Sequence, residues 1–384
     1  MVTVNQAAGL YIHIPFCVRK CPYCDFYSIT DPSFQTAYLE ALLLEMPLYR
    51  PWKTVFDTVY LGGGTPSILS LKAIHQMMTA AHDTFAIEEH AETTIEVNPG
   101  TIDAAKLGAY GQAGINRINI GVQSFDPANL AFLGRIHTVQ ESVAAIEAAR
   151  TAGFNNLGID LIYGLPDQAT ANWLADLKKA LTLQPEHLAC YMLTYEAGTP
   201  LDRARAQGRV TPLGEERSAR LLTLTRQFLE AHGYAQYEVS NFAKKTNSRA
   251  QNYRSRHNLK YWNRAPYLGL GPSAHSYTSP RRWWNVEHVR AYIAEIQAGR
   301  RPVAGQECLS RDQQMMEALY LGLRQTAGID IPAFEKNYAV DFQTWCGEPL
   351  AEMTQEGVLT LADTRCALTP KGMPLLDSVV ARLV

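Results

Sequence analysis

The stretch YIHIPFCVRKCPYCDFYS, residues 11–28, decides the fold of this chain, because a short apolar strand leads directly into three closely spaced cysteines. Cys17, Cys21 and Cys24 are separated by three intervening residues and then by two. Zinc sites usually take four ligands in two close pairs, whereas three thiolates in one loop suit a cubane iron–sulfur cluster. The loop is therefore expected to bind three irons of a [4Fe–4S] cluster and to leave the fourth iron open. A zinc or disulfide site is the alternative for the same residues.

The composition is that of an intracellular enzyme-like protein. The chain has 384 residues, of which 47% are hydrophobic, enough for one large packed domain and a smaller one. Seven cysteines, three of them clustered, do not form a disulfide framework, and an air-sensitive cluster requires a reducing compartment, so we expect a cytoplasmic location. The formal net charge of −2 gives no basic field of the kind that attracts nucleic acid.

The sequence also gives no sign of a membrane segment. The opening MVTVNQAAGL lacks the basic region and apolar core of a signal peptide. No apolar run approaches the roughly 18 residues that a membrane span needs. We therefore expect no membrane anchor.

Short apolar strands alternate with amphipathic helical stretches from Gly9 to about Phe242. Expected helices include 71–85, 142–153 and 218–233, and most of the helical stretches end in glycine. The expected strands lie at 10–15, 58–64, 93–99, 117–123, 157–165, 188–194 and 235–241. This alternation predicts an α/β fold with a parallel sheet, most simply an open, incomplete β/α barrel. A doubly wound sheet is the structural alternative, because sequence does not fix strand order.

The pattern changes after Phe242. Residues 243–305 are rich in Arg, Asn and aromatic residues with little helical or strand period, and we treat them as a connecting segment after a first domain at 1–242. A helical pattern at 311–328 followed by an alternating hairpin at 357–372 predicts a small α+β, winged-helix-like domain at 306–384.

Polar and glycine residues gather where the expected strands end. The cysteine loop follows the first strand, GGGTPS (62–67) the second, Glu96 and Asn98 the third, and Gln123 the fourth, while Asp160 lies in the fifth. In parallel β/α folds, ligands bind at the carboxyl ends of the strands. The sequence therefore predicts one rim that collects these side chains and the three cysteines.

The spacing C-x3-C-x2-C, with the aromatic Tyr23 before the last cysteine, resembles the signature loop of radical S-adenosylmethionine (SAM) proteins. An open iron could then bind the amino and carboxylate groups of SAM. Glu96 can pair with the SAM ammonium and Arg135 with its carboxylate, while Gln123 and Asp160 can bond the ribose hydroxyls. The structural alternatives are a solvated surface arginine and a helix-capping aspartate.

The ordered motifs YIHIPFC, GGGTPS, IEVNPG, GVQSFD and IDLIYGLP resemble the family of oxygen-independent coproporphyrinogen III oxidase and its relatives. The resemblance covers most of the chain, including its C-terminal module, and implies a radical SAM barrel. It places the cluster ligands on Cys17, Cys21 and Cys24. It places the SAM-binding residues on Tyr11, Gly63, Gly64, Thr65, Glu96, Gln123, Arg135 and Asp160.

Three features set the chain apart from the oxidases of that family and resemble the HemW-type heme chaperones. The oxidases carry a further cysteine where this chain has Phe26, and they have a longer segment before the first strand. HNLKYW, His257 to Trp262, fits the H-N-x-x-Y-W motif of the chaperones. Histidine commonly binds heme iron, and Tyr261 and Trp262 offer flat faces for a porphyrin, so these residues are the predicted heme site. Nearby arginines could pair with the propionates.

The sequence favours a heme chaperone that carries a [4Fe–4S] cluster and SAM and transfers heme to acceptor proteins. The resemblance implies respiratory or heme-storage proteins as the acceptors. The first alternative is an oxygen-independent coproporphyrinogen III oxidase, which decarboxylates propionate side chains by radical chemistry. A storage or regulatory protein with an inert cluster is the second. No catalytic residue is assigned. Cys190, Cys308, Cys346 and Cys366 are expected to be buried small hydrophobic residues.

Overall fold

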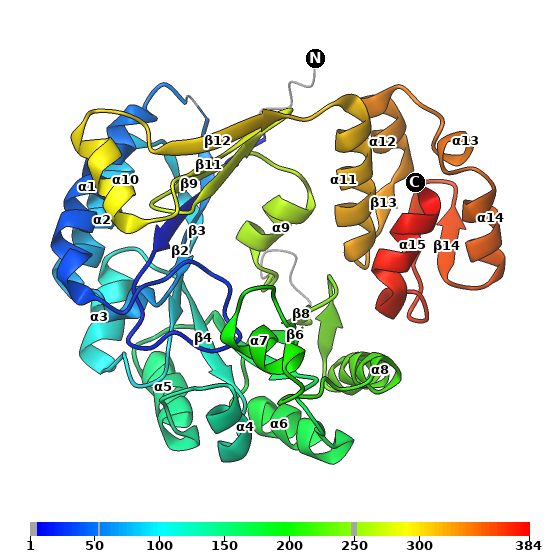
Figure 1. Ribbon diagram of the computed structural model, residues 1–384, viewed down its shortest axis with the longest axis horizontal. Helices are drawn as coiled ribbons and strands as arrows, with labels where there is room; N and C mark the ends of the chain where they lie inside the picture. The colour runs from blue at the N-terminus through cyan, green and yellow to red at the C-terminus, as the bar shows by residue number, and fades with distance from the viewer. Residues whose placement is uncertain (1–5, 53, 247–251) are drawn as a thin grey trace.

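The computed structural model describes residues 6–52, 54–246 and 252–384. Six parallel strands form the centre of one large sheet, and helices cover its outer face (Figure 1). The strands are β1 (Ala8–Ile14), β2 (Phe56–Gly63), β3 (Ile87–Val97), β4 (Arg117–Gln123), β5 (Leu157–Tyr163) and β6 (His187–Met192). The helices of this part are α1 (Gln35–Leu48), α2 (Leu71–Thr84), α3 (Ala104–Gln112), α4 (Pro127–Phe132), α5 (Val139–Thr151), α6 (Thr170–Thr182), α7 (Pro200–Ala206) and α8 (Glu215–Ala231).

The order of strands in the sheet decides between the two predicted topologies. The sheet runs β12-β11-β10-β9-β1-β2-β3-β4-β5-β6-β8-β7, so β1 to β6 lie side by side in chain order. A doubly wound sheet would reverse its strand order at a switch point, and none occurs among these six strands. The sheet ends at β12 and β7 without pairing them, which confirms the open, incomplete β/α barrel.

The seventh expected strand departs from the parallel pattern. Residues 235–241 contain the end of β7 (Tyr234–Gln236), a bend, and the start of β8 (Asn241–Lys244). β7 and β8 pair as an antiparallel hairpin, and β8 pairs antiparallel with β6. The amide of Tyr237 donates to the carbonyl of Asn241, which closes this hairpin. The prediction of a seventh parallel strand was therefore wrong.

Residues 243–305, interpreted above as a connecting segment, contain much of the regular structure on the other side of β1. Strand β9 (Tyr267–Leu270) pairs parallel with β1. Strands β10 (His275–Thr278), β11 (Arg281–Asn285) and β12 (Val303–Cys308) continue the sheet in antiparallel order. Helices α9 (Arg256–Trp262) and α10 (Val289–Gln297) belong to the same segment. These strands have only four to six residues, and β11 consists mostly of arginine and tryptophan, which hides their period from a pattern analysis.

The C-terminal module forms a second body of packed helices with its own small sheet, on the right of Figure 1. Its sheet has the order β13-β15-β14. The elements are α11 (Arg311–Arg324), β13 (Ile329–Asp330), α12 (Ile331–Tyr338), α13 (Phe342–Cys346), α14 (Glu348–Gln355), β14 (Leu359–Ala362), β15 (Arg365–Leu368) and α15 (Leu376–Leu383). Helices followed by a short hairpin agree with the predicted small α+β domain.

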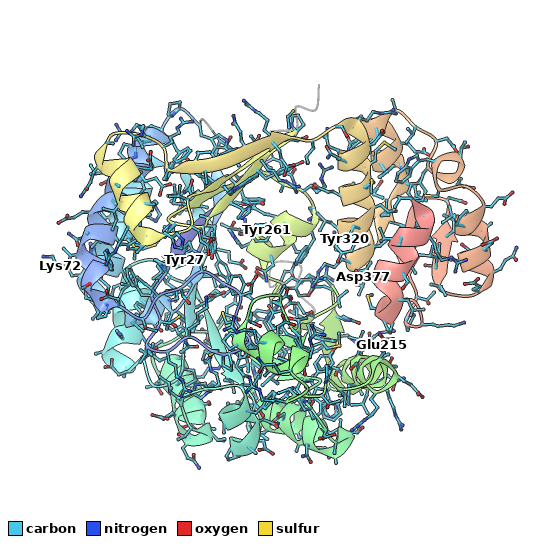
Figure 2. The ribbon with its side chains drawn as sticks, in the orientation of Figure 1. Tyr27, Lys72, Glu215, Tyr261, Tyr320 and Asp377 are labelled. Carbon is cyan, nitrogen blue, oxygen red and sulfur yellow. The ribbon has the colours of Figure 1, made fainter. Side chains whose placement is uncertain are left out.

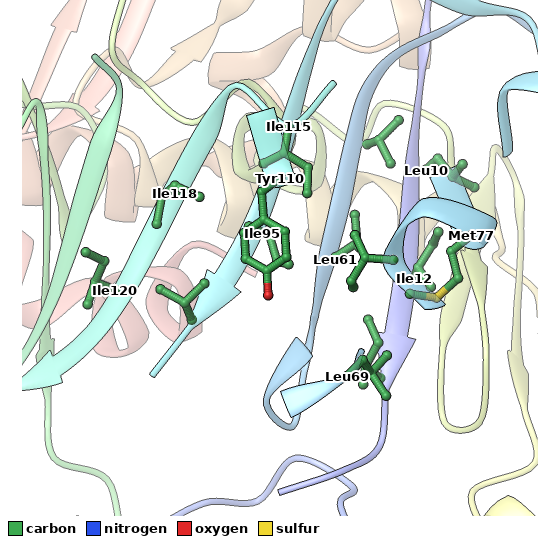
Figure 3. Packing of buried hydrophobic residues seen from close by; sticks show 14 of the residues in the cluster. Leu10, Ile12, Leu61, Leu69, Met77, Ile95, Tyr110, Ile115, Ile118 and Ile120 are labelled. Atoms are coloured by element: carbon green, nitrogen blue, oxygen red, sulfur yellow. The ribbon is translucent and has the colours of Figure 1, made fainter. Parts of the chain in front are cut away.

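The main core lies between the sheet and its outer helices. Figure 3 shows Leu10 and Ile12 of β1 beside Leu61 of β2 and Met77 of α2. All four side chains are fully buried. Because successive strand residues point to opposite faces, the residues between them, such as Tyr11, face the inside of the barrel. This alternation positions the functional site.

The four cysteines outside the loop were all expected to be buried, and the structure confirms this for three of them. Cys190, Cys346 and Cys366 are buried as predicted, but Cys308 is exposed at the end of β12. Burial of Cys308 was thus predicted wrongly, because β12 lies at an edge of the sheet.

Within the described ranges, no helix combines the length and apolar character that crossing a membrane requires.

Candidate functional site

The three predicted cluster cysteines lie in the loop that follows β1, and all three are partly exposed. The loop is fastened at its start, where the amide of Cys17 donates to the carbonyl of Ile29 at 2.9 Å. Polar groups from other loops of the barrel approach the sulfur atoms. The Thr65 hydroxyl lies 3.5 Å from the Cys17 sulfur, and Arg135 Nη1 lies 3.5 Å from the Cys21 sulfur.

The chemistry of this donor set fits an iron–sulfur cluster better than a single ion. Throughout the described part of the chain, no three His, Cys, Asp or Glu side chains converge on a position for one metal ion. A cubane cluster makes a different demand, because each thiolate binds a different iron. Burial raises the pKa of Cys24 to about 11, and a cluster iron bound to its sulfur would offset the cost of the thiolate charge.

The glycines at the end of β2 bring two segments of the chain into close contact. Gly63 has φ +107°, and a Cβ there would lie 2.6 Å from the His13 ring. A Cβ on Gly64 would lie 2.6 Å from the carbonyl oxygen of Phe16. The amides of Gly64 and Thr65 donate to carbonyls of Ile14 and Phe16. The GGGTP segment is thus fixed against the start of the cysteine loop, and its amides are already used.

Glu96 lies near the end of β3, held by groups from β2. Its Oε1 accepts a 2.6 Å hydrogen bond from the Tyr60 hydroxyl, and its Oε2 accepts a 3.3 Å bond from the amide of Gly63. Burial raises the pKa of Glu96, and these two hydrogen bonds oppose the rise. Tyr11 stacks on Tyr60 at 6.2 Å, and its hydroxyl bonds His13 Nδ1 at 3.1 Å. A cation beside Glu96 would offset the cost of its charge.

Arg135 is aimed at the rim by Asn98 and by the backbone of β4. Its Nη2 donates to Asn98 Oδ1 at 2.5 Å and to the carbonyl of Gly121 at 2.8 Å. A Cβ on Gly121 would lie 2.9 Å from Asn98 Oδ1, so glycine leaves room for this pair. Arg135 also lines a pocket with Cys21, Thr65 and Asn98. The predicted alternative of a solvated surface arginine does not describe this side chain.

Tyr23 belongs to the cysteine loop and lies next to Arg135. Burial raises its pKa, and the neighbouring Arg135 opposes that rise. For Arg135, burial alone would lower the pKa, but Tyr23 and Cys21 raise it on balance. The guanidinium therefore stays charged beside the loop.

Gln123 ends β4 in an unusual backbone conformation. Its φ is +70°, a left-handed value that costs energy for a residue with a side chain. The next residues are held by Asp176 of α6, which accepts bonds of 2.7 Å from the Ser124 hydroxyl and from the amide of Phe125. This buried contact fixes the turn that presents Gln123.

Asp160 in β5 carries an unused acceptor. Its Oδ2 accepts a 2.7 Å bond from Asn119, but the buried Oδ1 has no hydrogen-bond partner. Burial raises the pKa of Asp160 to about 7, an effect that Asn119 opposes and Glu96 adds to. A buried acceptor without a donor is unfavourable, and a ligand hydroxyl would satisfy it. This arrangement fits the ribose contact predicted for SAM and excludes the helix-capping alternative.

The residues of the predicted heme motif point in different directions from α9. His257 is 1% exposed, and its ring nitrogens bond the Thr58 hydroxyl at 2.8 Å and the Tyr261 hydroxyl at 2.9 Å. Burial lowers its pKa to about 3, with Lys260 adding to the effect. Tyr261 is half-buried near the centre of the molecule (Figure 2). Trp262 turns toward the C-terminal module, where Arg324 covers its ring at 4.4 Å.

The structure thus brings His257 and Tyr261 together, and the ring of Trp262 meets Tyr261 edge to face with centroids 6.4 Å apart. Neither nitrogen of His257 is free to bind iron in this arrangement, which sequence could not reveal. The arginines near the motif also have protein partners. Arg256 pairs with Asp57, and Arg264 donates to the carbonyl of Gln314.

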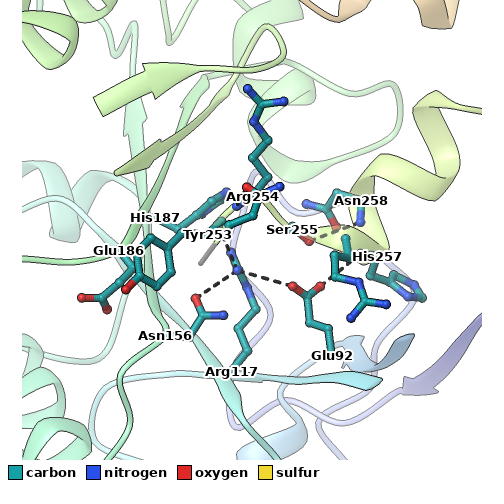
Figure 4. Close-up of polar contacts among 12 residues, drawn as sticks. Glu92, Arg117, Asn156, Glu186, His187, Tyr253, Arg254, Ser255, His257 and Asn258 are labelled. Atoms are coloured by element: carbon teal, nitrogen blue, oxygen red, sulfur yellow. Dashed lines mark hydrogen bonds and ion pairs between the residues drawn. The ribbon is translucent and has the colours of Figure 1, made fainter. Parts of the chain in front are cut away.

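Helix α9 is fastened to the amino-terminal end of the barrel by buried polar contacts (Figure 4). The amide of His257 donates to Glu92 at 3.1 Å, and Glu92 pairs with the buried Arg117 at 3.7 Å. Arg117 also donates to the carbonyl of Tyr253. The motif therefore lies beneath the rim, inside the barrel.

Four residues of the site were missed or left without a role in the sequence analysis. Asn98 was placed on the rim without a partner, whereas Tyr60, Gly121 and Asp176 were not identified. Tyr60 and Gly121 could have been found from the strand alternation, since each lies two residues from a predicted rim residue on the same face. Nothing in the sequence indicates that Asp176 contacts Ser124.

Comparison with known proteins agrees with this geometry. The model of the Radical SAM superfamily matches residues 11–179, and that of the HemN C-terminal domain matches residues 309–375. The structure of coproporphyrinogen III oxidase (HemN) from Escherichia coli, a radical SAM enzyme, superposes with a TM-score of 0.84 at 24% identity. The superposition covers 98% of this chain and 90% of that one. The fold and the rim define a radical SAM protein.

Similar sequences narrow the class further. The heme chaperone HemW of Lactococcus lactis is 32% identical over 382 residues, which are 99% of this chain and 98% of the relative. HemW of Bacillus subtilis is 33% identical over 374 residues, which are 96% of this chain and 97% of the relative. HemW of Escherichia coli is 39% identical over 274 residues, 70% and 69% of the two chains. The chain belongs to the HemW family of heme chaperones.

Proposed function

We propose that this chain binds heme and transfers it to acceptor proteins, and that it carries a [4Fe–4S] cluster and SAM at the rim of its barrel. The observation that carries the proposal is the meeting of three partly exposed thiols with Arg135 and the unpaired oxygen of Asp160 at that rim. Membership of the radical SAM superfamily implies the cluster and SAM. The names of the relatives support heme as the cargo.

Each rim residue has a proposed task. Cys17, Cys21 and Cys24 hold the cluster, whose open iron supplies a position for the amino and carboxylate groups of SAM. Glu96 holds the ammonium, and Arg135 the carboxylate. The carbonyls of Gly63 and Gly64 contact the methionyl end of SAM. Thr65 supports the cysteine loop, and Tyr11 and Tyr23 pack beside it. Gln123 and Asp160 form hydrogen bonds to the ribose.

For heme, the proposed residues are those of the α9 motif. Tyr261 offers a half-buried aromatic face, and Trp262 a second one once Arg324 moves. His257 can bind the iron only if Nε2 gives up its bond to Tyr261, because its other nitrogen already bonds Thr58. Heme binding through this histidine is therefore proposed to involve a rearrangement of the motif.

Oxygen-independent coproporphyrinogen III oxidation is the second candidate. The fold likeness to the Escherichia coli oxidase and the complete SAM rim favour it. Against it stands Phe26, which is 64% exposed where the oxidases have a further cysteine by the resemblance described above. We propose the cytoplasm as the place of action, since an oxygen-sensitive cluster needs a reducing compartment.

The proposal is tested with reconstituted protein under anaerobic conditions. Wild-type protein is titrated with heme and is separately incubated with reductant, SAM and coproporphyrinogen III. Stoichiometric heme binding followed by transfer to an apoprotein, without conversion of the porphyrinogen, is the expected result. Conversion without heme binding selects the oxidase.

Cys21→Ser tests the cluster within the same experiment. Serine is a poor ligand in place of a thiolate, so the variant should lose the broad charge-transfer absorption of the cluster. Cys308→Ser is the matched control, because Cys308 is an exposed thiol on β12, outside the rim. A Cys21→Ser protein that still binds four irons and four sulfides contradicts the assignment of the loop.

A further inference from the structure

A column of aromatic rings links α9 to the carboxylate proposed to hold the SAM ammonium. The ring of His257 stacks on Tyr60 with centroids 5.0 Å apart and an angle of 26° between the planes. The column consists of these two rings, and Tyr11 packs beside both of them, with its ring 6.2 Å from that of Tyr60 and 6.3 Å from that of His257. The Tyr60 hydroxyl then donates to Glu96 at 2.6 Å. The position of the ring of Tyr60 thus decides where the hydroxyl meets Glu96.

Two glycines make room for this column. A Cβ on Gly9 would lie 3.0 Å from Cε1 of His257, and a Cβ on Gly62 would lie 2.9 Å from Cε1 of Tyr60. Both positions are therefore in direct contact with the rings. Because closely packed side chains transmit displacements, a shift of the His257 ring is expected to move Tyr60.

The lower end of the column is fixed from three directions. Thr58 and Tyr261 bond the two ring nitrogens of His257, and Glu92 accepts from its backbone amide. Burial lowers the pKa of His257 to about 3, so the ring is neutral at physiological pH. One nitrogen is then a donor and the other an acceptor, which matches two hydroxyl partners.

We propose that His257 is a positioning residue of the SAM site, which holds the ring of Tyr60 and through it the carboxylate of Glu96. This inference rests on the proposed SAM site. The inference gives His257 a role in the protein without heme. The hydrogen bonds of its two ring nitrogens to Thr58 and Tyr261 already hold the ring in the position that this role requires.

The test measures SAM affinity by equilibrium dialysis of the anaerobically reconstituted protein. An aromatic stacking contact is worth a few-fold in affinity, so His257→Ala should weaken SAM binding about three- to tenfold. In a Tyr60→Phe background, where the hydroxyl that reaches Glu96 is absent, His257→Ala should change the affinity less than about twofold. A general loss of structure would lower the affinity equally in both backgrounds.

Two further variants keep the inference testable if His257→Ala does not fold. His257→Phe retains a flat ring against Tyr60 and should keep most of the SAM affinity. Thr58→Val removes one partner of the imidazole and should weaken SAM binding in the same direction as His257→Ala, by a smaller factor. Arg256→Gln is the control, because it breaks an ion pair on the same helix without touching the column.

Failure of the inference differs from failure of the proposed function. If Glu96→Gln weakens SAM binding while His257→Ala and Thr58→Val leave it unchanged, the positioning role is wrong and the SAM site stands. Equal losses for His257→Ala in both backgrounds also overturn the positioning role. If Glu96→Gln itself leaves SAM affinity unchanged, the SAM site is wrong and the inference falls with it.

Discussion

Asp160 should lower the folding stability of the apoprotein and raise the affinity for SAM. The substitution Asp160→Asn separates these two effects. Burial raises the pKa of this carboxyl to about 7, whereas its ordinary value is 3.8. The folded state therefore keeps the proton over a range in which the unfolded chain releases it. Folding stability falls as the pH rises between these values and stays low above them. A pKa difference of this size corresponds to about 4 kcal/mol.

The introduced amide carries no charge, so it avoids this cost at high pH. Its oxygen can keep the bond from Asn119, but its nitrogen takes the place of the unpaired Oδ1 and has no acceptor, which costs about 1–3 kcal/mol. The apoprotein with Asp160→Asn should then be more stable than wild type by roughly 1–3 kcal/mol at pH 8. At pH 5 the carboxyl is protonated in the folded wild type but ionised in its unfolded chain, which still costs wild type about 1.6 kcal/mol. Because this cost is similar to that of the unpaired amide in the variant, the two proteins should be about equally stable.

The same substitution should damage SAM binding. Loss of a charged acceptor for the ribose hydroxyls costs roughly 1.5–3 kcal/mol, or about ten- to a hundredfold in affinity. Urea unfolding of the apoprotein at both pH values and equilibrium dialysis with SAM measure the two effects. Asp126→Asn is the control, because Asp126 caps α4 and asparagine caps equally well. A variant with unchanged SAM affinity and the same stability difference at both pH values would refute the argument.

Two further predictions concern packing at the rim and the buried carboxyl of Glu45 in α1. Gly121→Ala should push Asn98 and Arg135 apart and weaken SAM binding at least about tenfold, with unchanged cluster content. The control is Gly108→Ala, whose added Cβ meets no atom within 4 Å and which should leave the SAM affinity measured by equilibrium dialysis unchanged. Burial raises the pKa of Glu45 to about 7 from 4.5, so Glu45→Gln should gain about 3 kcal/mol relative to wild type between pH 5 and pH 8.5 in urea unfolding. Equal differences at both pH values would contradict this.

The barrel and its rim could be predicted because their signals are local in the sequence. Each strand from β1 to β5 shows its apolar pattern within a few residues, and the polar residue at its end follows directly. Parallel strands bring these ends to one edge whatever the details of packing. Glu96, Gln123 and Asp160 could therefore be assigned to the same rim before their hydrogen-bond partners were known.

The parts that could not be predicted depend on contacts between distant residues. Asp176 acts on the site only through Ser124, which lies 52 residues earlier in the chain. The hairpin of β7 and β8 forms because β8 pairs antiparallel with β6, a choice that the apolar pattern of 235–241 does not contain. Cys308 is exposed because β12 ends the sheet, and sequence gives no strand order.

The histidine of the α9 motif shows how the identity of a side chain and its partners can point to different roles. Histidine beside aromatic residues favours heme ligation, but the partners of His257 are Thr58, Tyr261 and Tyr60. If heme iron takes Nε2, the bond to Tyr261 is lost and the support of Tyr60 changes. By thermodynamic linkage, SAM and heme would then alter each other's affinity by the same factor, which heme titrations with and without SAM measure. A factor of one would mean that heme binds without displacing His257 from the column.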